Sequence, residues 1–269
     1  MNQAPVGVFD SGLGGLSVLR EIRALLPDES LAYLADSKYA PYGDKPESFV
    51  EARTLQACEW LAAQGCKAIV VACNTATGHA VQTLRERLSL PIIGVEPGLK
   101  PAAAASRSKV VGVLATANTL KSAKFGRLLA SLDGESRFIC EAGRGLVQLV
   151  EQGDVSGPAV REKLDTYLAP MLAAGADTLV LGCTHYPFLS ETIRAMVGDR
   201  LALVDTGDAI ARQLSRKLAE HGLHAPAGAA PRDRYLSTKD ATHLRDMVKT
   251  LLHLDAPAET VVIEPAPAF

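Results

Sequence analysis

Short apolar runs alternate along the chain with longer stretches in which apolar residues recur at helical spacing. Apolar runs of about four to eight residues bounded by turn residues are typical of buried parallel strands. The pattern predicts strands before Cys73 and Cys183 and at residues 5–9, 31–35, 91–95, 109–114, 138–140 and 201–204. It predicts helices at residues 16–26, 47–64, 75–88, 160–174, 189–197 and 209–221. This alternation indicates an α/β protein with mostly parallel sheets flanked by helices.

Two of these strands end in the same way. Gly65–Thr75 and Gly175–His185 each contain a glycine, two small or polar residues, a buried strand, a small residue and then a cysteine. The cysteine therefore lies at the carboxyl end of its strand, where open α/β sheets bind ligands. Cys73 and Cys183 are 110 positions apart, and polar residues follow both of them directly. We interpret them as parts of one site that was built twice.

The repeat extends to other strands. Val6–Ser11 resembles Val111–Thr116, and Ile93–Gly98 resembles Leu203–Gly207, at nearly the same offset. We therefore expect two similar α/β domains related by pseudo-two-fold symmetry, with the active site in the cleft between them. The expected boundaries are residues 1–97 plus 208–269 for a discontinuous first domain and 98–207 for the second.

Several turns carry local predictions. Residues 10–15 form a glycine-rich turn that lacks the dinucleotide-binding spacing and the P-loop lysine, so it is either an anion cradle or a turn that needs positive φ. Asp44, with Glu47 after it, resembles a helix N-cap, and Asn74 or Thr75 is available to cap another helix. Residues 222–232 resemble a linker, and residues 261–263 are a candidate last strand.

Composition excludes several classes of function. The net charge of −2 and the 5% aromatic content give no basic surface or stacking platform for nucleic acid. No apolar run approaches the length of about 20 residues that spans a membrane. The start of the chain does not resemble a signal peptide, and an odd number of cysteines favours reduced thiols in a cytoplasm. No CxxC occurs and Cys183-x-His185 alone is weak support for a ligand set, so we expect no metal site.

Two thiols in matching loops suit proton exchange at a carbon stereocentre. One thiolate would remove a proton from one face of the carbon, and the opposite thiol would return a proton to the other face. Helix N-termini after Cys73 and Cys183 would favour the thiolate. His185 could exchange a proton with Cys183, and Asp10 could orient Cys73 or its proton.

Polar groups beside the thiols could hold the carboxylates of a small acidic amino acid. These are Ser11, Asn74, Thr75 and Thr184. Thr116 and Thr119 lie at a helix start, where a hydroxyl either caps the helix or binds a carboxylate, and we expect at least one of them to cap. Tyr42 and Gly43 lie in a polar loop, where a simple surface turn competes with a pocket lining. Glu151, a lone glutamate on a helix, is expected to be solvated.

At these residues the sequence resembles the glutamate racemase family of the aspartate/glutamate racemase superfamily. The matching motifs are Val8–Gly15, Pro41–Gly43, Ala72–Thr75, Ala115–Thr116 with Thr119, and Gly182–Pro187. They occur in the family's order and span residues 7 to about 210. The Cys183–Pro187 run after a buried strand is the most specific, whereas the last 45 or so residues are less diagnostic.

The resemblance implies interconversion of L- and D-glutamate without a cofactor, in a bacterial cytoplasm, with D-glutamate used for peptidoglycan. It implies that Cys73 acts on D-glutamate and Cys183 on L-glutamate, and that Asp10, His185 and Glu151 assist proton transfer. The implied substrate-binding residues are Asp10, Ser11, Tyr42, Gly43, Asn74, Thr75, Thr116, Thr119, Thr184 and His185. The implied partner is the small-molecule substrate, and a homodimer is expected.

Other functions remain open at this point. A racemase for aspartate or another small amino acid differs only in the depth of its pocket, and a non-catalytic two-lobed binding protein would bind an amino acid without exchanging its Cα hydrogen. A Cys–His hydrolase would need only one thiol. A racemase that uses pyridoxal phosphate would need a Schiff-base lysine, and Lys38 and Lys67 are the nearest to the motif ends.

Overall fold

The computed structural model describes residues 3–264 and divides the chain into two compact units. Unit 1 comprises the chain up to Val95 and from Gly207 onward, and unit 2 comprises Glu96–Thr206. The expected boundaries, after residues 97 and 207, lie one or two positions later than those of the structure. Unit 1 is discontinuous in the sequence because the chain returns to it at Gly207, after unit 2.

Unit 1 is built on a six-stranded sheet with the order β10-β9-β2-β1-β3-β4. Its strands are β1 (Val6–Asp10), β2 (Leu31–Ala35), β3 (Ala68–Val71), β4 (Ile92–Gly94), β9 (Arg234–Ser237) and β10 (Ala258–Thr260). All neighbours pair in parallel. Parallel strands need crossover connections, which the intervening helices supply.

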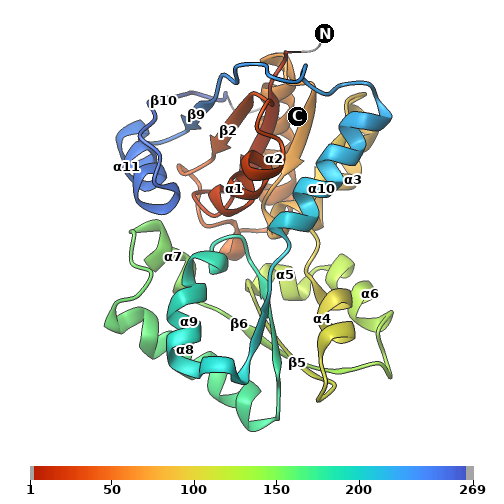
Figure 1. The fold of residues 1–269 in the computed structure, drawn as a ribbon, viewed down its shortest axis with the longest axis vertical. Helices are drawn as coiled ribbons and strands as arrows, with labels where there is room; N and C mark the ends of the chain where they lie inside the picture. The colour runs from red at the N-terminus through yellow and green to blue at the C-terminus, as the bar shows by residue number, and fades with distance from the viewer. Residues whose placement is uncertain (1–2, 265–269) are drawn as a thin grey trace. The chain divides into compact units, whose positions relative to one another are not determined.

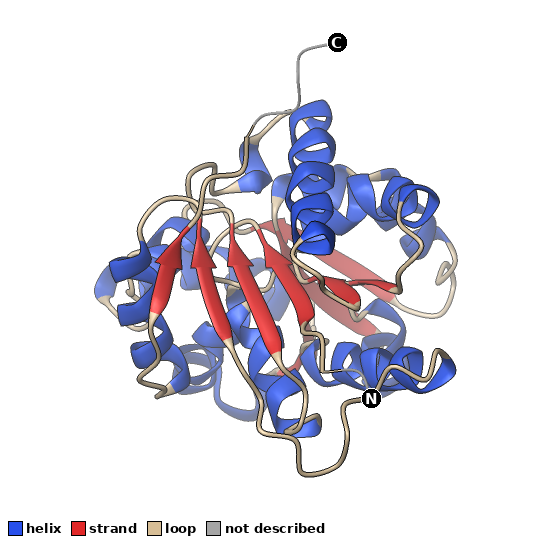
Figure 2. Ribbon diagram, turned by 90° about the horizontal axis from the view of Figure 1, so that it is seen from above, coloured by secondary structure: helices blue, strands red, loops and turns tan. Residues whose placement is uncertain are grey.

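Helices cover both faces of this sheet (Figures 1 and 2). The helices of unit 1 are α1 (Leu16–Leu25), α2 (Glu47–Ala63), α3 (Asn74–Arg87), α10 (Gly207–Glu220) and α11 (Ala241–Leu252), with the short 3-10 helix η1 (Tyr42–Asp44). α2 and α3 pack against each other, and α1 packs against α10 and α11. Phe9, Ile69 and Val71 join the core under α2 and α3, and alternate residues such as Val8 and Val70 are fully buried as well.

Unit 2 contains a four-stranded parallel sheet with the order β6-β5-β7-β8. Its strands are β5 (Val110–Ala115), β6 (Arg137–Ala142), β7 (Thr178–Gly182) and β8 (Ala202–Val204). Its helices are α4 (Leu99–Ala105), α5 (Ala117–Lys121), α6 (Ala123–Ala130), α7 (Leu146–Glu151), α8 (Pro158–Ala173) and α9 (Ser190–Val197), with the 3-10 helices η2 (Tyr186–Leu189) and η3 (Gly198–Arg200).

The two sheets share one topology. The order β2-β1-β3-β4 in unit 1 matches β6-β5-β7-β8 in unit 2, with β9 and β10 added at one edge of the first sheet. β1 corresponds to β5 and β3 to β7, which are the strands whose sequences repeat. The prediction of two parallel sheets flanked by helices is therefore confirmed.

Two predictions about the ends of elements in unit 1 are wrong. Asp44 does not cap α2, because the helix begins after Pro46 and Lys45 is extended. A residue that precedes proline is disfavoured in the helical region, so Lys45 separates Asp44 from the helix. The last strand is Ala258–Thr260 rather than residues 261–263, because its partner β9 ends at Ser237.

The structure contains no disulfide bond and no membrane-spanning helix among residues 3–264. All five cysteines are free thiols. Within residues 3–264, no helix is both long enough and apolar enough to cross a lipid bilayer.

Candidate active site

The predicted site residues follow the strands at which the order of each sheet reverses. In unit 1 this switch point lies between β1 and β3, which end at Asp10 and directly before the Ala72–Cys73 pair. In unit 2 it lies between β5 and β7, which end before Thr116 and Cys183. Open α/β sheets bind ligands outside the carboxyl ends of the strands at this point. Each unit thus presents one thiol where its fold favours ligand binding.

Cys73 is held by the helix that follows it. Its sulfur accepts a hydrogen bond from the backbone N–H of Ala76 at 3.4 Å, so the thiol itself is the N-cap of α3. The expected cap, Asn74 or Thr75, lies instead inside the first turn of the helix. The Cys73 thiol also donates to Oγ of Ser11, with a sulfur–oxygen distance of 3.5 Å. The positive end of the helix dipole therefore stabilises negative charge on this sulfur.

Asp10 organises the glycine-rich turn. Its side chain is fully buried, and Oδ1 accepts a hydrogen bond from the backbone N–H of Gly12 at 2.8 Å. Gly15 has a φ of −61°, so this glycine does not meet a need for positive φ. A Cβ at Gly15 would instead lie 2.6 Å from Cβ of Asp10. The glycine lets the start of α1 pass close to the carboxylate.

Asn74 and Thr75 begin α3 and are both buried. Oδ1 of Asn74 has no hydrogen-bond partner in the part of the chain that the structure describes. A buried acceptor without a donor costs about 1–3 kcal/mol. A ligand with an N–H or O–H group would remove this cost, so Asn74 is suited to bind one.

Tyr42 and Gly43 are buried residues of η1 rather than an exposed turn. The phenol of Tyr42 donates to Oδ2 of Asp36 at 2.6 Å. This hydroxyl is therefore engaged within unit 1. The sequence alone does not single out Asp36, although a polar residue directly after a buried strand at the carboxyl edge of a sheet is the signal that could have found it.

In unit 2, Cys183, His185 and Glu151 form a continuous polar chain. Sγ of Cys183 lies 3.6 Å from Nδ1 of His185, and Nε2 of His185 lies 2.6 Å from Oε1 of Glu151. The expectation that Glu151 is solvated is wrong, because this residue at the end of α7 binds the histidine ring. β7 positions Cys183 and α7 positions Glu151, so the ring between them can hold or move a proton.

His185 carries a strongly altered acidity. Burial by itself disfavours the charged ring and lowers the pKa of His185. The hydrogen bonds to Cys183 and Glu151, together with the electrostatic effect of these two groups, outweigh burial and raise this pKa well above its ordinary value. This shift favours the imidazolium form of the ring. An imidazolium beside a sulfur stabilises negative charge on that sulfur and can return a proton to it.

The remaining predicted residues of unit 2 lie at the same sheet edge. Thr116 caps α5: its Oγ1 accepts from the N–H of Thr119 at 3.2 Å and donates to Oγ1 of Thr119 at 2.9 Å. The expectation that at least one of these threonines caps a helix is confirmed. Thr184, next to Cys183, is buried. Across residues 3–264, no group of three or more His, Cys, Asp or Glu side chains is arranged to hold a metal ion.

Known proteins resemble this chain in sequence and in fold. The Asp/Glu/Hydantoin racemase family matches residues 13–214 of the chain. A glutamate racemase of Cupriavidus pinatubonensis is 78% identical over 269 residues, which cover 100% of this chain and 99% of that protein. The chain belongs to the Asp/Glu/Hydantoin racemase family.

Solved structures of glutamate racemases resemble the chain over nearly its whole length. The isoform RacE1 from Bacillus anthracis superimposes with a TM-score of 0.88 at 31% identity, covering 98% of this chain and 99% of that one. The Escherichia coli glutamate racemase, solved in complex with L-glutamate and the activator UDP-MurNAc-ala, gives a TM-score of 0.83 at 34% identity and covers 96% of this chain and 97% of that one. These two solved structures and the Cupriavidus relative are all of proteins named glutamate racemase.

Proposed function

We propose that the protein interconverts L- and D-glutamate without a cofactor, by proton transfer between Cα and two thiols. One observation carries the proposal: each unit has a buried thiol within two residues of the end of the equivalent strand of its sheet, at the switch point. The near-complete coverage of a glutamate racemase at 78% identity supports glutamate as the substrate.

The chemistry requires one base and one acid on opposite faces of Cα. With D-glutamate, the thiolate of Cys73 removes the Cα proton and the two electrons of that bond remain on the substrate. The Cys183 thiol then donates its proton to the other face, which gives L-glutamate. In the reverse direction Cys183 is the base and Cys73 the acid, so each turnover leaves the base protonated and the acid as a thiolate.

The groups around each sulfur are suited to assist proton transfer at that sulfur. His185, positioned by Glu151, exchanges protons with Cys183 and stabilises its negative charge. In unit 1, Ser11 accepts from Cys73, and Asp10 holds the turn that carries Ser11. In this proposal Asp10 also assists proton transfer. Its side chain is fully buried.

The polar groups at the two sheet edges would bind the substrate. The unpartnered Oδ1 of Asn74 suits the α-ammonium group, which is a donor. Hydroxyl and backbone N–H groups suit the two carboxylates. The residues proposed for this role are Asp10, Ser11, Tyr42, Gly43, Asn74, Thr75, Thr116, Thr119, Thr184 and His185.

We further propose the cellular setting. D-Glutamate from this reaction would enter peptidoglycan precursors in a bacterial cytoplasm, and the protein would act as a homodimer. Light scattering of the purified protein tests the dimer: a mass of about one 28.4 kDa chain would contradict it.

The function is tested with purified protein and no added cofactor. D-Glutamate in D2O is followed by circular dichroism and proton NMR, with D-aspartate in a parallel sample. We expect loss of optical activity and deuterium at Cα with glutamate only. Exchange with aspartate alone would indicate a different racemase of the superfamily, and binding without exchange would indicate a binding protein.

A further inference from the structure

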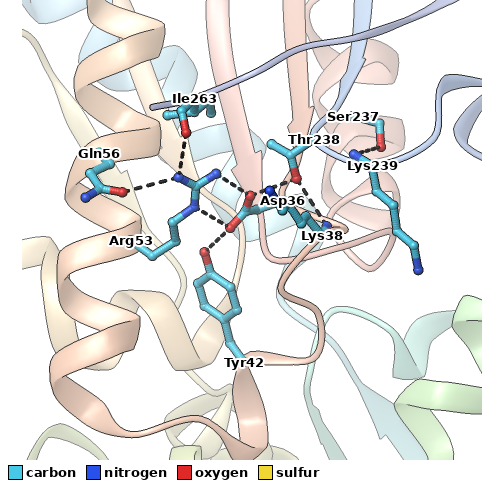
Figure 3. A network of polar contacts seen from close by, with 9 residues as sticks. All are labelled: Asp36, Lys38, Tyr42, Arg53, Gln56, Ser237, Thr238, Lys239 and Ile263. Atoms are coloured by element: carbon cyan, nitrogen blue, oxygen red, sulfur yellow. Dashed lines mark hydrogen bonds and ion pairs between the residues drawn. The ribbon is translucent and has the colours of Figure 1, made fainter. Parts of the chain in front are cut away.

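A buried polar network in unit 1 connects Tyr42 to residues outside the motifs discussed so far. Its centre is the ion pair between Arg53 of α2 and Asp36, which follows β2 (Figure 3). Nη2 of Arg53 donates to Oδ1 of Asp36 at 2.8 Å, and Nε donates to Oδ2 at 2.9 Å. The arginine side chain is 6% exposed and the aspartate 0%. This bidentate geometry fixes both groups in orientation as well as in distance.

The network reaches the loop between β2 and α2 at two points. Tyr42 donates its phenol hydrogen to the same Oδ2 of Asp36 at 2.6 Å. The guanidinium of Arg53 also stacks on the ring of Tyr39, 4.8 Å from its centroid. Burial raises the pKa of Tyr42 well above its ordinary value, and the charge of Asp36 adds to this effect, so the phenol remains a donor. Arg53 thus holds the loop through Asp36 and through an aromatic contact.

The network also reaches the C-terminal part of the chain. Oγ1 of Thr238, just after β9, donates to Oδ1 of Asp36 at 2.8 Å and accepts from the N–H of Lys38 at 3.1 Å. The carbonyl of Ile263 accepts from Nη1 of Arg53 at 3.2 Å, and the Ile263 side chain packs in the core of unit 1. The segment after β9 and the segment after β10 therefore contact the same ion pair.

Stability alone is a poor explanation for such a network. Desolvation of two charges offsets much of their attraction, and apolar replacements of buried ion pairs are often neutral or stabilising. What a buried, bidentate pair with further hydrogen bonds provides is one fixed geometry for the groups attached to it. Here the attached group is the loop that ends at Tyr42 and Gly43.

We propose that Arg53 and Thr238 are positioning residues that hold the Tyr42–Gly43 loop in its substrate-binding geometry, with the C-terminal part of the chain as support. The proposal rests on the proposed function, in which Tyr42 and Gly43 bind glutamate. A misplaced loop would weaken binding of substrate and transition state alike, which raises KM and leaves kcat nearly unchanged.

The test compares two conservative variants with matched controls. Arg53→Lys keeps the charge but loses the fork that binds Asp36 in two places. Thr238→Val keeps the shape but removes both hydrogen bonds of the hydroxyl. The controls are Arg87→Lys, in an exposed ion pair with Glu59, and Thr250→Val, whose hydroxyl donates to the carbonyl of Asp246 in its own helix.

We expect both network variants to raise the KM for glutamate by about fivefold or more, with kcat changed by less than about twofold. Hydrogen exchange followed by mass spectrometry should show faster exchange in peptides that cover residues 39–45, and the controls should match the wild type in both measurements. Folded network variants with an unchanged KM would overturn the proposal, even if their Tm falls.

Hydrogen exchange separates this proposal from the function on which it rests. If the wild-type protein does not exchange the Cα proton of glutamate with solvent, the proposed function fails. The rate of backbone amide exchange at residues 39–45 then still decides whether Arg53 and Thr238 anchor the loop. Unchanged exchange in both network variants would refute the anchoring itself.

Discussion

Replacing Glu151 with glutamine isolates the effect of one negative charge on His185. The Glu151 carboxylate lies 2.6 Å from Nε2 of the ring, and the side chains are 17% and 4% exposed. Hydrogen bonds to charged groups contribute about 1.5–3 kcal/mol, roughly twice the value of neutral ones. Glutamine retains a neutral acceptor, so Glu151→Gln should lower the free energy of unfolding by about 1 kcal/mol near pH 6.

The sign of the pH dependence follows from the raised pKa of His185 in the folded state. Below about pH 6.5, the ordinary value, both folded and unfolded states carry the proton, and the stabilisation by the imidazolium is fully present. As the pH rises through the folded-state pKa, the folded protein loses this proton and the stabilisation disappears. The difference between wild type and Glu151→Gln should therefore be largest near pH 6 and shrink in alkaline solution.

Urea denaturation of both proteins at a series of pH values measures this difference. NMR of the imidazole resonances reports the pKa of His185 directly and should show that it is lower in Glu151→Gln than in the wild type. Glu59→Gln, in an exposed ion pair with Arg87, is the control and should change little. A wild-type His185 that titrates at its ordinary pKa, or a stability difference that grows with pH, would refute the reasoning.

Substitutions at three further positions test individual contacts. Cys73→Ala should lower the free energy of unfolding by about 0.5 kcal/mol because the cap on α3 is lost, whereas Cys73→Ser keeps a strong cap and should be as stable as the wild type in urea denaturation while activity falls. Burial disfavours the charge of Asp177, but hydrogen bonds from Ser106 and from backbone N–H groups hold its pKa well below the ordinary value. The loss of stability in Asp177→Asn should therefore be constant above about pH 5 and shrink as the pH falls below about 3.9, with an unchanged loss at pH 3 as the contrary result. Gly15→Ala should lower the Tm, with a cost of about 1–3 kcal/mol from the clash with Asp10, and an unaltered Tm would show that the turn can move aside.

The strands and the site motifs were predictable because their signals are local. A buried apolar run followed by Cys73 or Cys183 reports both a strand and its exposed end, and the repeated order of such runs anticipated the shared topology of the two sheets. Parallel strands that are buried on both faces read as continuous apolar runs, which makes them easy to find in a sequence.

Contacts between distant segments were not predictable. The bond between Glu151 and His185 joins residues 34 positions apart, and neither residue type signals the other. The Arg53–Asp36 network likewise depends on α2 lying beside the loop after β2 and on Ile263 returning to the same place. Such contacts arise from packing, so a lone glutamate or arginine on a helix gives no sign of them.

The predicted ends of helices and strands were wrong where another interaction determined the end. Asp44 fits the pattern of an N-cap, but the restriction that Pro46 places on Lys45 moves the helix start. Val261–Ile263 has the apolar character of a strand, yet Ile263 fills the core and its carbonyl binds Arg53. Cys73 is not among the usual capping residues, yet its sulfur accepts from the backbone N–H of Ala76 and caps α3.

The central claim is that two thiols act on opposite faces of one carbon. It is tested most directly by following D-glutamate in D2O with the wild-type protein, Cys73→Ser and Cys183→Ser, using circular dichroism for racemisation and NMR for deuterium at Cα. The wild type should form L-glutamate that carries deuterium at Cα, and each variant should racemise about 10²–10⁴-fold more slowly because it lacks one of the two proton-transfer groups. Racemisation by either variant within about tenfold of the wild-type rate would contradict the two-thiol account.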